Sequence, residues 1–255
     1  FLNSRIPFDS YKAAVSGTYF VDKSALLTEL LPALGTSQRF FCITRPRRFG
    51  KSVMANMVGA FFSKQADAAG IFSQLQIASP QAAQKLEKSG CSAYQAYLNQ
   101  SDILYIDFSE MPENCVSYAA YITRILQGLK KDLSDTFPES NINPDDSVWD
   151  ILTTKNKKTG QRFVFVMDEW DAVFHMGFIT DSDKKAYLLF LKSLLKDKIY
   201  VQLAYMTGIL PIAKYSDGSE LNMFVEYNMA SSERFSQYFG FSNSEVSHLF
   251  EIYEN

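Results

Sequence analysis

Compact apolar runs alternate along the chain with stretches of helical periodicity. Four runs are almost wholly apolar and rich in β-branched and aromatic residues, which is typical of buried strands. These runs occupy residues 39–44, 103–108, 163–167 and 199–206. A less regular stretch at 223–229 is a candidate for a further strand. Because the strands lack a polar face, they favour a mainly parallel sheet covered by helices on both sides, and hence a three-layer α/β/α fold.

Helical periodicity follows the first strand directly. Beyond Ser52, apolar residues recur at intervals of three and four and form one face of a predicted helix. The residues of this face are Val53, Met54, Met57, Val58, Phe61 and Phe62. Other predicted helices cover 118–133, 149–153, 184–196 and 244–253, the last begun by a serine cap. The polar stretch 138–147 and the lysine-rich stretch 155–160 are predicted to be loops.

Composition narrows the class of protein. With 255 residues, 47% of them hydrophobic, the chain can bury one large α/β core. The formal net charge of -3 creates no overall field toward nucleic acid or an anionic membrane, so any nucleic-acid contact would be local. Cys42, Cys91 and Cys115 lie far apart without a CxxC pair, which argues against a disulfide framework or a zinc site. This cysteine pattern fits a reducing cytoplasm best. No apolar run approaches the roughly 20 residues of a membrane span.

The segment between the first strand and the helix after it contains Gly50-Lys51-Ser52. A phosphate-binding loop needs inward-turned backbone N–H groups, a helix N-terminus and a lysine, and this segment provides them. Gly50 permits unusual dihedrals, Lys51 would neutralise the β- and γ-phosphates, and the Ser52 hydroxyl would bind Mg²⁺. The general pattern G-x-x-x-x-G-K-[ST] has glycine where this chain has Arg45. The alternative is a chance match at an ordinary helix start, and the flanking strand and helix argue against it.

The predicted nucleotide-binding residues form a continuous run. They are Arg45, Pro46, Arg47, Arg48, Phe49, Gly50, Lys51, Ser52 and Val53. Upstream, Tyr19, Phe20, Asp22 and Lys23 could border the adenine, because an aromatic face stacks on a base. Packing at a helix start, with Asp22 at the N-cap, explains these residues equally well. Candidates for an arginine finger are Arg45, Arg47, Arg48 and Arg234, and a structural or solvated role is the alternative for each.

Two acids, Asp168 and Glu169, directly follow the third strand. In hydrolysing P-loop proteins such an aspartate holds Mg²⁺, and a neighbouring glutamate polarises the attacking water. The alternatives are two exposed turn residues, or, with Asp171, a metal nuclease that would leave the phosphate loop unexplained. Thr207, at the end of the fourth strand, is a candidate for sensing the γ-phosphate. The strand at 103–108 between the two motifs, together with Glu after Asp, points to the additional-strand, catalytic-glutamate division of P-loop proteins.

Five short segments form a pattern more specific than either nucleotide motif alone. They are Gly17–Ser24, Thr44–Ser52, Val166–Asp171, Thr207–Ile212 and Tyr238–Phe241. In this order they resemble the AAA-ATPase-like family, whose bacterial members are often joined to a C-terminal PD-(D/E)XK nuclease-like domain. The resemblance implies ATP binding, ATP hydrolysis and a nuclease-like partner domain outside these 255 residues. It also makes Arg45 the family's own variant of the loop.

The leading interpretation is a Mg²⁺-dependent ATPase that couples its nucleotide state to a partner domain, with nucleic acid as an indirect target. A non-hydrolysing nucleotide switch or interaction module is the alternative. We expect an N-terminal segment at 1–38 that flanks the nucleotide site, a P-loop core at 39–214, and a helical extension at 215–255 that begins a lid or partner domain.

Overall fold

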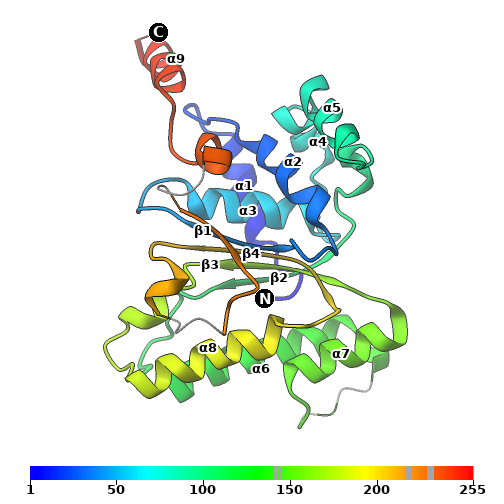
Figure 1. Ribbon diagram of the computed structural model, residues 1–255, viewed down its shortest axis with the longest axis vertical. Helices are drawn as coiled ribbons and strands as arrows, with labels where there is room; N and C mark the ends of the chain where they lie inside the picture. The colour runs from blue at the N-terminus through cyan, green and yellow to red at the C-terminus, as the bar shows by residue number, and fades with distance from the viewer. Residues whose placement is uncertain (141–142, 144, 216–219, 229–232, 255) are drawn as a thin grey trace.

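A β-sheet forms the middle layer of the protein. The computed structural model describes residues 1–140, 143, 145–215, 220–228 and 233–254. Within these ranges five strands form one sheet in the order β2-β3-β4-β1-β5, and every neighbouring pair is parallel (Figure 1). The strands are β1 (Phe40–Thr44), β2 (Asp102–Asp107), β3 (Phe163–Asp168), β4 (Val201–Gly208) and β5 (Val225–Tyr227). The predicted α/β fold with a parallel sheet is therefore confirmed.

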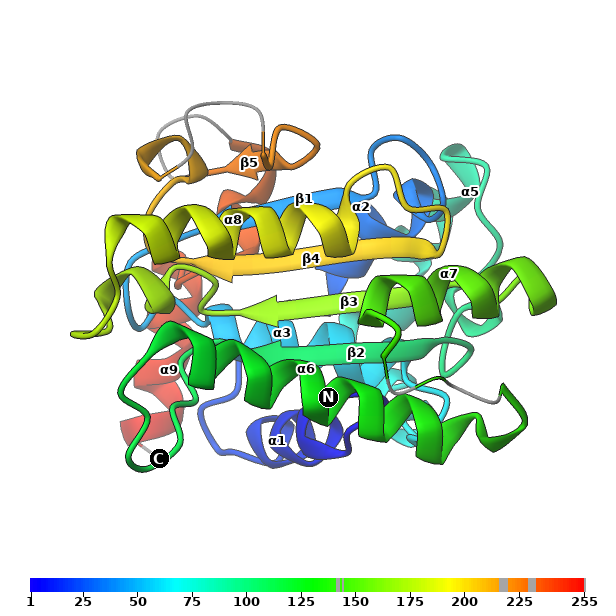
Figure 2. The ribbon, with the colours of Figure 1, turned by 90° about the horizontal axis from the view of Figure 1, so that it is seen from below.

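Helices cover both faces of the sheet, as the view from below in Figure 2 shows. One face carries α1 (Ile6–Val15), α2 (Leu27–Leu30), α3 (Lys51–Phe62), α4 (Ala69–Phe72) and α5 (Pro80–Lys88). The other face carries α6 (Tyr118–Thr136), α7 (Val148–Thr159) and α8 (Asp181–Leu195). The last helix, α9 (Asn243–Glu254), projects from the body of the protein.

The two hydrophobic cores follow from the alternation of side chains along each strand. In β3, Val164 and Val166 pack in the core beneath α3, whereas Phe165 and Met167 pack in the core against α6, α7 and α8. All four side chains are fully buried. A central strand covered on both faces has no position for a polar side chain, so it is apolar throughout.

Most predicted boundaries agree with the structure to within three residues, and the differences have local causes. Helix α8 begins at Asp181 because Thr180 and Asp183 form a capping box there. Strand β4 begins at Val201, after Ile199, whose side chain is 70% exposed. The candidate strand at 223–229 is confirmed as the shorter β5, and Met229 lies outside the described residues.

The prediction of a basic loop at 155–160 is wrong, because these residues form the last turns of α7 and its C-cap. The helix ends at Thr159, and its C-cap, Gly160, has a left-handed φ of 70°. Lys155 is only 8% exposed, and its ammonium lies 2.7 Å from Glu139 Oε1 and 4.1 Å above the ring of Phe137. Long lysine stems cover apolar surface while the charge finds a partner, so a lysine-rich stretch can be a packed helix.

The order of the strands brings three strand ends together. Strand β4 lies between β1 and β3, and the register places Thr44 opposite Gly208 and Met167 opposite Met206. The carboxyl ends of parallel strands form the usual ligand-binding edge of an α/β sheet. In sequence, β2 lies between the strand that precedes the candidate phosphate loop, β1, and the strand that carries Asp168, β3. In the sheet, β2 lies at the outer edge, and β4 is the strand between β1 and β3.

Candidate functional site

The candidate phosphate loop joins the end of β1 to the start of α3. Arg48 and Gly50 adopt left-handed backbone conformations, with φ of 67° and 77°. Nothing lies within 4 Å of the position of a Cβ at Gly50, so glycine is needed there for its backbone conformation and not for space. Gly50 is the N-cap of α3, whose 12 residues direct the positive end of the helix dipole at the loop. This arrangement suits a bound anion.

Lys51 is the first residue of α3, and its side chain folds back across the loop. The residue is 4% exposed. Its ammonium donates a hydrogen bond to the carbonyl oxygen of Pro46 (3.2 Å) and lies 3.7 Å from Glu169 Oε1. A lysine this buried requires such partners. The charge is therefore held between the loop and the acidic end of β3.

Asp168 ends β3 and is 2% exposed. Its Oδ1 accepts hydrogen bonds from the Thr207 hydroxyl and from the backbone N–H of Glu169 (3.1 Å). Burial raises the pKa of Asp168 and the nearby Asp107 adds to the rise, while hydrogen bonds from Ser52 and Thr207 oppose it. The carboxylate is thus well oriented but poorly stabilised in its ionised form, which favours a cation beside it.

Glu169 sits at a sharp turn directly after β3. Its φ of 51° is left-handed, which is uncommon for a residue with a Cβ. Burial raises the pKa of Glu169, and the ammonium of Lys51 opposes that rise. The next residue, Trp170, points to the other face of the sheet, where it is fully buried against Phe174. This turn directs Glu169 toward the phosphate loop.

Asp171 does not join the other two acids. It is 1% exposed, and its carboxylate accepts hydrogen bonds from the backbone N–H groups of Ile209 (3.1 Å) and Leu210 (2.9 Å). The side chain therefore holds the loop that follows β4. In the described ranges, no group of three or more His, Cys, Asp or Glu residues is arranged to hold a metal ion.

A cavity of about 270 Å³ beside Ser52 and Asp168 contains site residues that the sequence interpretation missed. Asp107 and Arg124 also line it. Asp107 ends β2 and pairs in register with Asp168, so two carboxylates lie side by side at the sheet edge. Like Asp168, Asp107 directly follows a run of mostly apolar residues in the sequence, and this signal could have identified it. Arg124 lies on α6 and has no comparable sequence signal.

A second cavity, of about 410 Å³, opens beside the phosphate loop. The loop contributes Arg48, Phe49, Gly50 and Val53, and the N-terminal segment contributes Gly17, Thr18, Tyr19, Phe20, Val21 and Lys23. Tyr238, Gly240 and Phe241 line it from the C-terminal segment. Tyr19 and Phe20 are thus brought to the loop, whereas Asp22 accepts hydrogen bonds from the backbone N–H groups of Ser24 and Gln76 (2.7 and 2.5 Å).

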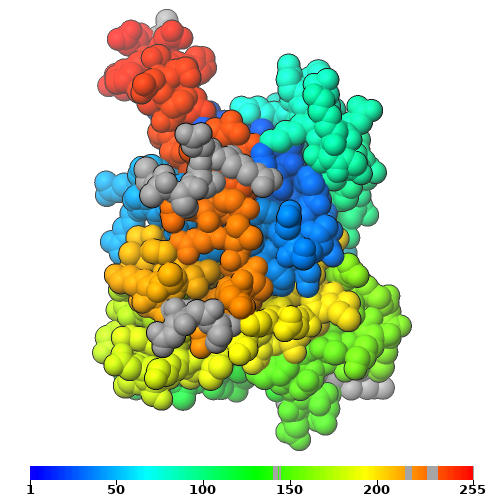
Figure 3. Space-filling model, viewed as in Figure 1, coloured from blue at the N-terminus to red at the C-terminus, as the bar shows by residue number. Residues whose placement is uncertain are grey.

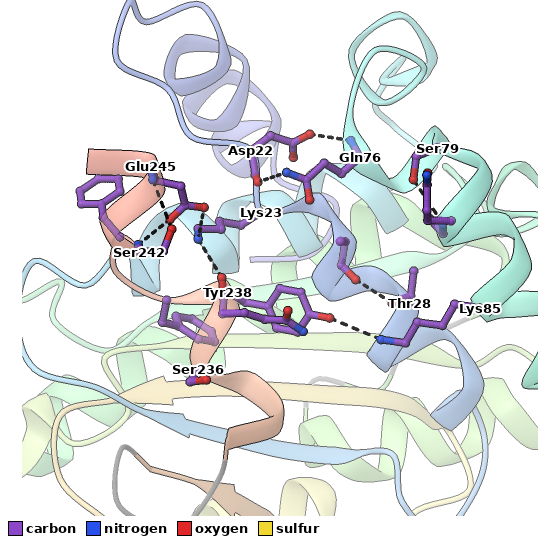
Figure 4. A pocket seen from close by; sticks show the side chains of 16 residues that line it. Asp22, Lys23, Thr28, Gln76, Ser79, Lys85, Ser236, Tyr238, Ser242 and Glu245 are labelled. Atoms are coloured by element: carbon purple, nitrogen blue, oxygen red, sulfur yellow. Dashed lines mark hydrogen bonds and ion pairs between the residues drawn. The ribbon is translucent and has the colours of Figure 1, made fainter. Parts of the chain in front are cut away.

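A larger cleft of about 740 Å³ adjoins this cavity and is shown in Figure 4. Lys23, Tyr238 and Phe241 line both spaces. The Lys23 ammonium lies 2.6 Å from Glu245 Oε1 and donates to the carbonyl oxygen of Gln237 (2.7 Å). Polar side chains of the cleft are therefore engaged with one another, and Lys51 and Asp168 are not among its lining residues.

The candidate arginine fingers occupy different environments. Arg45 is 2% exposed and donates hydrogen bonds to the carbonyl oxygens of Thr44 and Tyr227. Arg47 and Arg48 are exposed on the loop itself. The side chain of Arg234 lies outside the described residues.

One known protein family matches most of the chain. The chain belongs to the AAA-ATPase-like family, whose model, described as a predicted AAA-ATPase, matches residues 6–216. The match spans the phosphate loop, Asp168, Glu169 and Thr207 and confirms the expected family. No curated protein and no solved structure matches the chain. Among the helices of the described ranges, none has the length and apolarity needed to cross a membrane.

Proposed function

We propose that the protein binds ATP with Mg²⁺ at the carboxyl ends of β1, β3 and β4 and hydrolyses the ATP. The observation that carries this proposal is the convergence of Lys51, Asp168, Glu169 and Thr207 at one edge of the sheet. Lys51 and Glu169 form the 3.7 Å ion pair, and the Thr207 hydroxyl donates a hydrogen bond to Asp168. Membership in a family described as a predicted AAA-ATPase supports the same chemistry.

The nucleotide would lie across the phosphate loop. The loop backbone, the N-terminus of α3 and the Lys51 ammonium would hold the β- and γ-phosphates. The base would enter the cavity of about 410 Å³, where Tyr19 and Phe20 provide aromatic surface. The two subsites share Gly50 and Val53, so one ligand can occupy both.

The oxygen donors at the end of β3 fit Mg²⁺, which prefers hard oxygen ligands. The Ser52 hydroxyl and the Asp168 carboxylate would hold the ion, and Asp107 adds negative charge beside them. Bound there, Mg²⁺ would neutralise phosphate charge. Thr207 orients Asp168 through its hydrogen bond. A contact between Thr207 and the γ-phosphate stays a prediction.

Glu169 is the proposed general base. Its carboxylate is partly exposed at 26%, so a water molecule can reach it, and its burial-raised pKa moves its basicity toward neutral pH. It would accept a proton from the water that attacks the γ-phosphate. The order β5-β1-β4-β3-β2, with a strand inserted between the two motif strands, supports placement in the additional-strand, catalytic-glutamate division.

We also propose that the protein acts in the cytoplasm and relays its nucleotide state to a partner domain of the nuclease-like kind that the family resemblance implies. Helix α9 supports the relay. It projects from the body, and its exposed Val246, Phe250 and Tyr253 lie at helical spacing on one face. The same helix is joined through Glu245 to Lys23, which lines the proposed base cavity.

Phosphate release by the purified chain, measured with ATP and Mg²⁺, tests the proposal. Lys51→Ala should abolish ATP binding, and Glu169→Gln should keep binding but stop turnover. Phosphate release by Glu169→Gln at the normal rate would remove Glu169 from the role of base.

A non-hydrolysing nucleotide switch is the second candidate. The observation that favours it is Arg45, whose guanidinium is bonded to main-chain carbonyls and is not presented to the phosphates as an arginine finger would be. Tight ATP binding without phosphate release, even when partner proteins are added, would select the switch over the ATPase.

A further inference from the structure

Arg45 stands where the general phosphate loop has glycine, and its side chain is buried beneath the loop. Its guanidinium donates hydrogen bonds to the carbonyl oxygens of Thr44 (2.9 Å) in β1 and of Tyr227 (2.6 Å) in β5. Its charged carbon lies 5.3 Å from the centre of the Phe239 ring, a cation–π distance. One side chain thus joins the loop, the edge strand and the C-terminal segment.

The backbone at position 45 does not need glycine. Left-handed conformations in the loop occur at Arg48 and Gly50, and Arg45 is not among the residues with positive φ. A glycine at position 45 would therefore relieve no strain, and it would make the loop more flexible before binding. Burial lowers the pKa of the Arg45 guanidinium, and a buried guanidinium is tolerated only where fixed partners compensate it. Nη1 makes both hydrogen bonds, and in the described part of the chain the buried Nη2 has no hydrogen-bond partner, so the contacts with Thr44, Tyr227 and Phe239 are what place the side chain.

The C-terminal segment also touches the loop at a second point. The backbone N–H of Gly240 donates to the carbonyl oxygen of Phe49 (3.3 Å), and a Cβ at Gly240 would lie 3.1 Å from the Phe49 ring. Gly240 and its neighbours Tyr238 and Phe241 line the proposed base cavity. Between these two contacts, the wall of the base cavity is held at a fixed distance from the phosphate loop.

We propose that Arg45 is a positioning residue that fixes the phosphate loop relative to the base cavity by joining β5 and Phe239 to the loop. This inference rests on the proposed nucleotide function. Restoring the general motif with Arg45→Gly should therefore weaken ATP binding. Two charge-assisted hydrogen bonds and an aromatic contact would be lost, so we expect at least about tenfold weaker binding.

The choice of ligand separates positioning from simple destabilisation. ATP would span the loop and the base cavity, whereas inorganic tripolyphosphate would occupy the loop alone. Dissociation constants for both ligands should be measured by calorimetry on wild type, Arg45→Gly, Arg45→Met and Arg45→Lys, well below each melting temperature. We expect Arg45→Gly and Arg45→Met to lose much more affinity for ATP than for tripolyphosphate. Arg45→Lys keeps the charge on a side chain of different shape and should recover only part of the loss.

Two further single variants and one double variant complete the test. Phe239→Leu should reproduce the preferential loss of ATP affinity, and combining it with Arg45→Met should add little, because both act through one contact. Lys157→Ala removes an exposed positive charge on α7 and should change neither affinity. Equal losses for ATP and tripolyphosphate, or an Arg45→Gly variant that binds ATP as tightly as wild type, would overturn the inference. Failure of wild type to bind ATP would instead overturn the proposed function.

Discussion

The ammonium of Lys51 lies 3.7 Å from Glu169 Oε1, so the proposed phosphate ligand and the proposed general base form an ion pair. The two side chains are 3% and 26% exposed, so solvent and salt screen this pair less than a surface pair. The oxygens of a bound phosphate would compete with Glu169 for the same ammonium. In the proposed function, nucleotide binding would therefore be coupled to the release of Glu169 from this ion pair.

Glu169→Gln removes the competing charge while it keeps the size of the side chain. We expect ATP to bind about three- to tenfold more tightly and phosphate release to fall by about 100-fold or more, the usual contribution of a general base. Calorimetric binding and a phosphate-release assay measure the two effects. Glu113→Gln, an exposed acid, serves as the control for loss of a negative charge. Weaker ATP binding by Glu169→Gln would show that the ion pair does not compete with phosphate.

The same glutamate predicts the pH dependence of turnover. Burial raises the pKa of Glu169 above its ordinary value of 4.5, with Lys51 opposing the rise. Because a base must be ionised to accept a proton, the rate should fall as the pH drops through this raised pKa. The acid limb of kcat/KM for ATP, which reports the groups of the free protein, should lie above the ordinary glutamate range. An acid limb at or below pH 4.5 would assign it to another group.

The raised pKa of Asp168 predicts that Mg²⁺ binding affects the thermal stability of the fold. Its folded-state pKa is raised above the ordinary 3.8, so its favourable contribution to stability is fully present below that value and is lost as the pH rises through the folded pKa. At neutral pH, without metal, the ionised Asp168 therefore destabilises the fold. Asp168→Asn should melt higher than wild type in chelator, by about 2–4 °C for each kcal/mol relieved.

Addition of Mg²⁺ provides the second half of this experiment. Wild type should melt at a higher temperature with Mg²⁺, and Asp168→Asn should respond much less because one proposed ligand has lost its charge. Asp145→Asn changes an exposed acid between α6 and α7 that lines no part of the cavity beside Asp168, and it should leave the Mg²⁺ response intact. A lower melting temperature for Asp168→Asn in chelator would contradict the burial argument.

Local signals are enough to predict where the candidate phosphate loop and the two acids at the end of β3 lie in the fold. Gly50, Lys51 and Ser52 act at one strand-to-helix junction, and Asp168 ends a run of five apolar residues, so both features are visible within short windows. The apolar strands likewise identified the parallel sheet. Such predictions succeed because the residues that determine each element are neighbours in sequence.

Features that depend on long-range packing could not be predicted in the same way. Asp107 belongs to the site only because β2 pairs with β3, and no local pattern specifies that order. The partners of Arg45, Tyr227 and Phe239, are more than 180 positions away along the chain. Lys155 was assigned to a loop from its polarity, and only the position of Phe137 shows why its stem is buried.

Gly208 packs closely against Trp170 and Asp171, which follow Glu169 in the turn after β3. A Cβ there would lie 2.4 Å from Trp170 Cδ1 and 2.8 Å from Asp171 Oδ1, and both of these side chains are buried and cannot move aside. Gly208→Ala should therefore destabilise the fold by about 1–3 kcal/mol and reduce turnover by displacing the turn that carries Glu169. Gly177→Ala is a matched control, because nothing lies within 4 Å of its Cβ position. Equal midpoints in denaturant for the two variants would refute the steric argument.

Helix α9 is connected to the body of the protein through Lys23 and Glu245, and Figure 3 shows the helix standing out from the surface. Glu245 also caps the helix, since its Oε2 accepts a hydrogen bond from the backbone N–H of Ser242 (2.7 Å). The described residues of α9 include none that is buried, so this ion pair should contribute much of its attachment. Lys23 additionally lines the proposed base cavity.

Lys23→Met should therefore loosen α9 without unfolding the sheet. We expect hydrogen exchange of 243–254 to accelerate by about fivefold, which corresponds to a partly buried ion pair worth about 1 kcal/mol. Glu245→Gln should have a similar effect, and the double variant should add little because the two side chains form one contact. Lys12→Met, an exposed lysine on α1, is the control. If ATP slows exchange of α9 in wild type and not in Lys23→Met, the base cavity and α9 are coupled through Lys23; equal protection in both would place the coupling elsewhere.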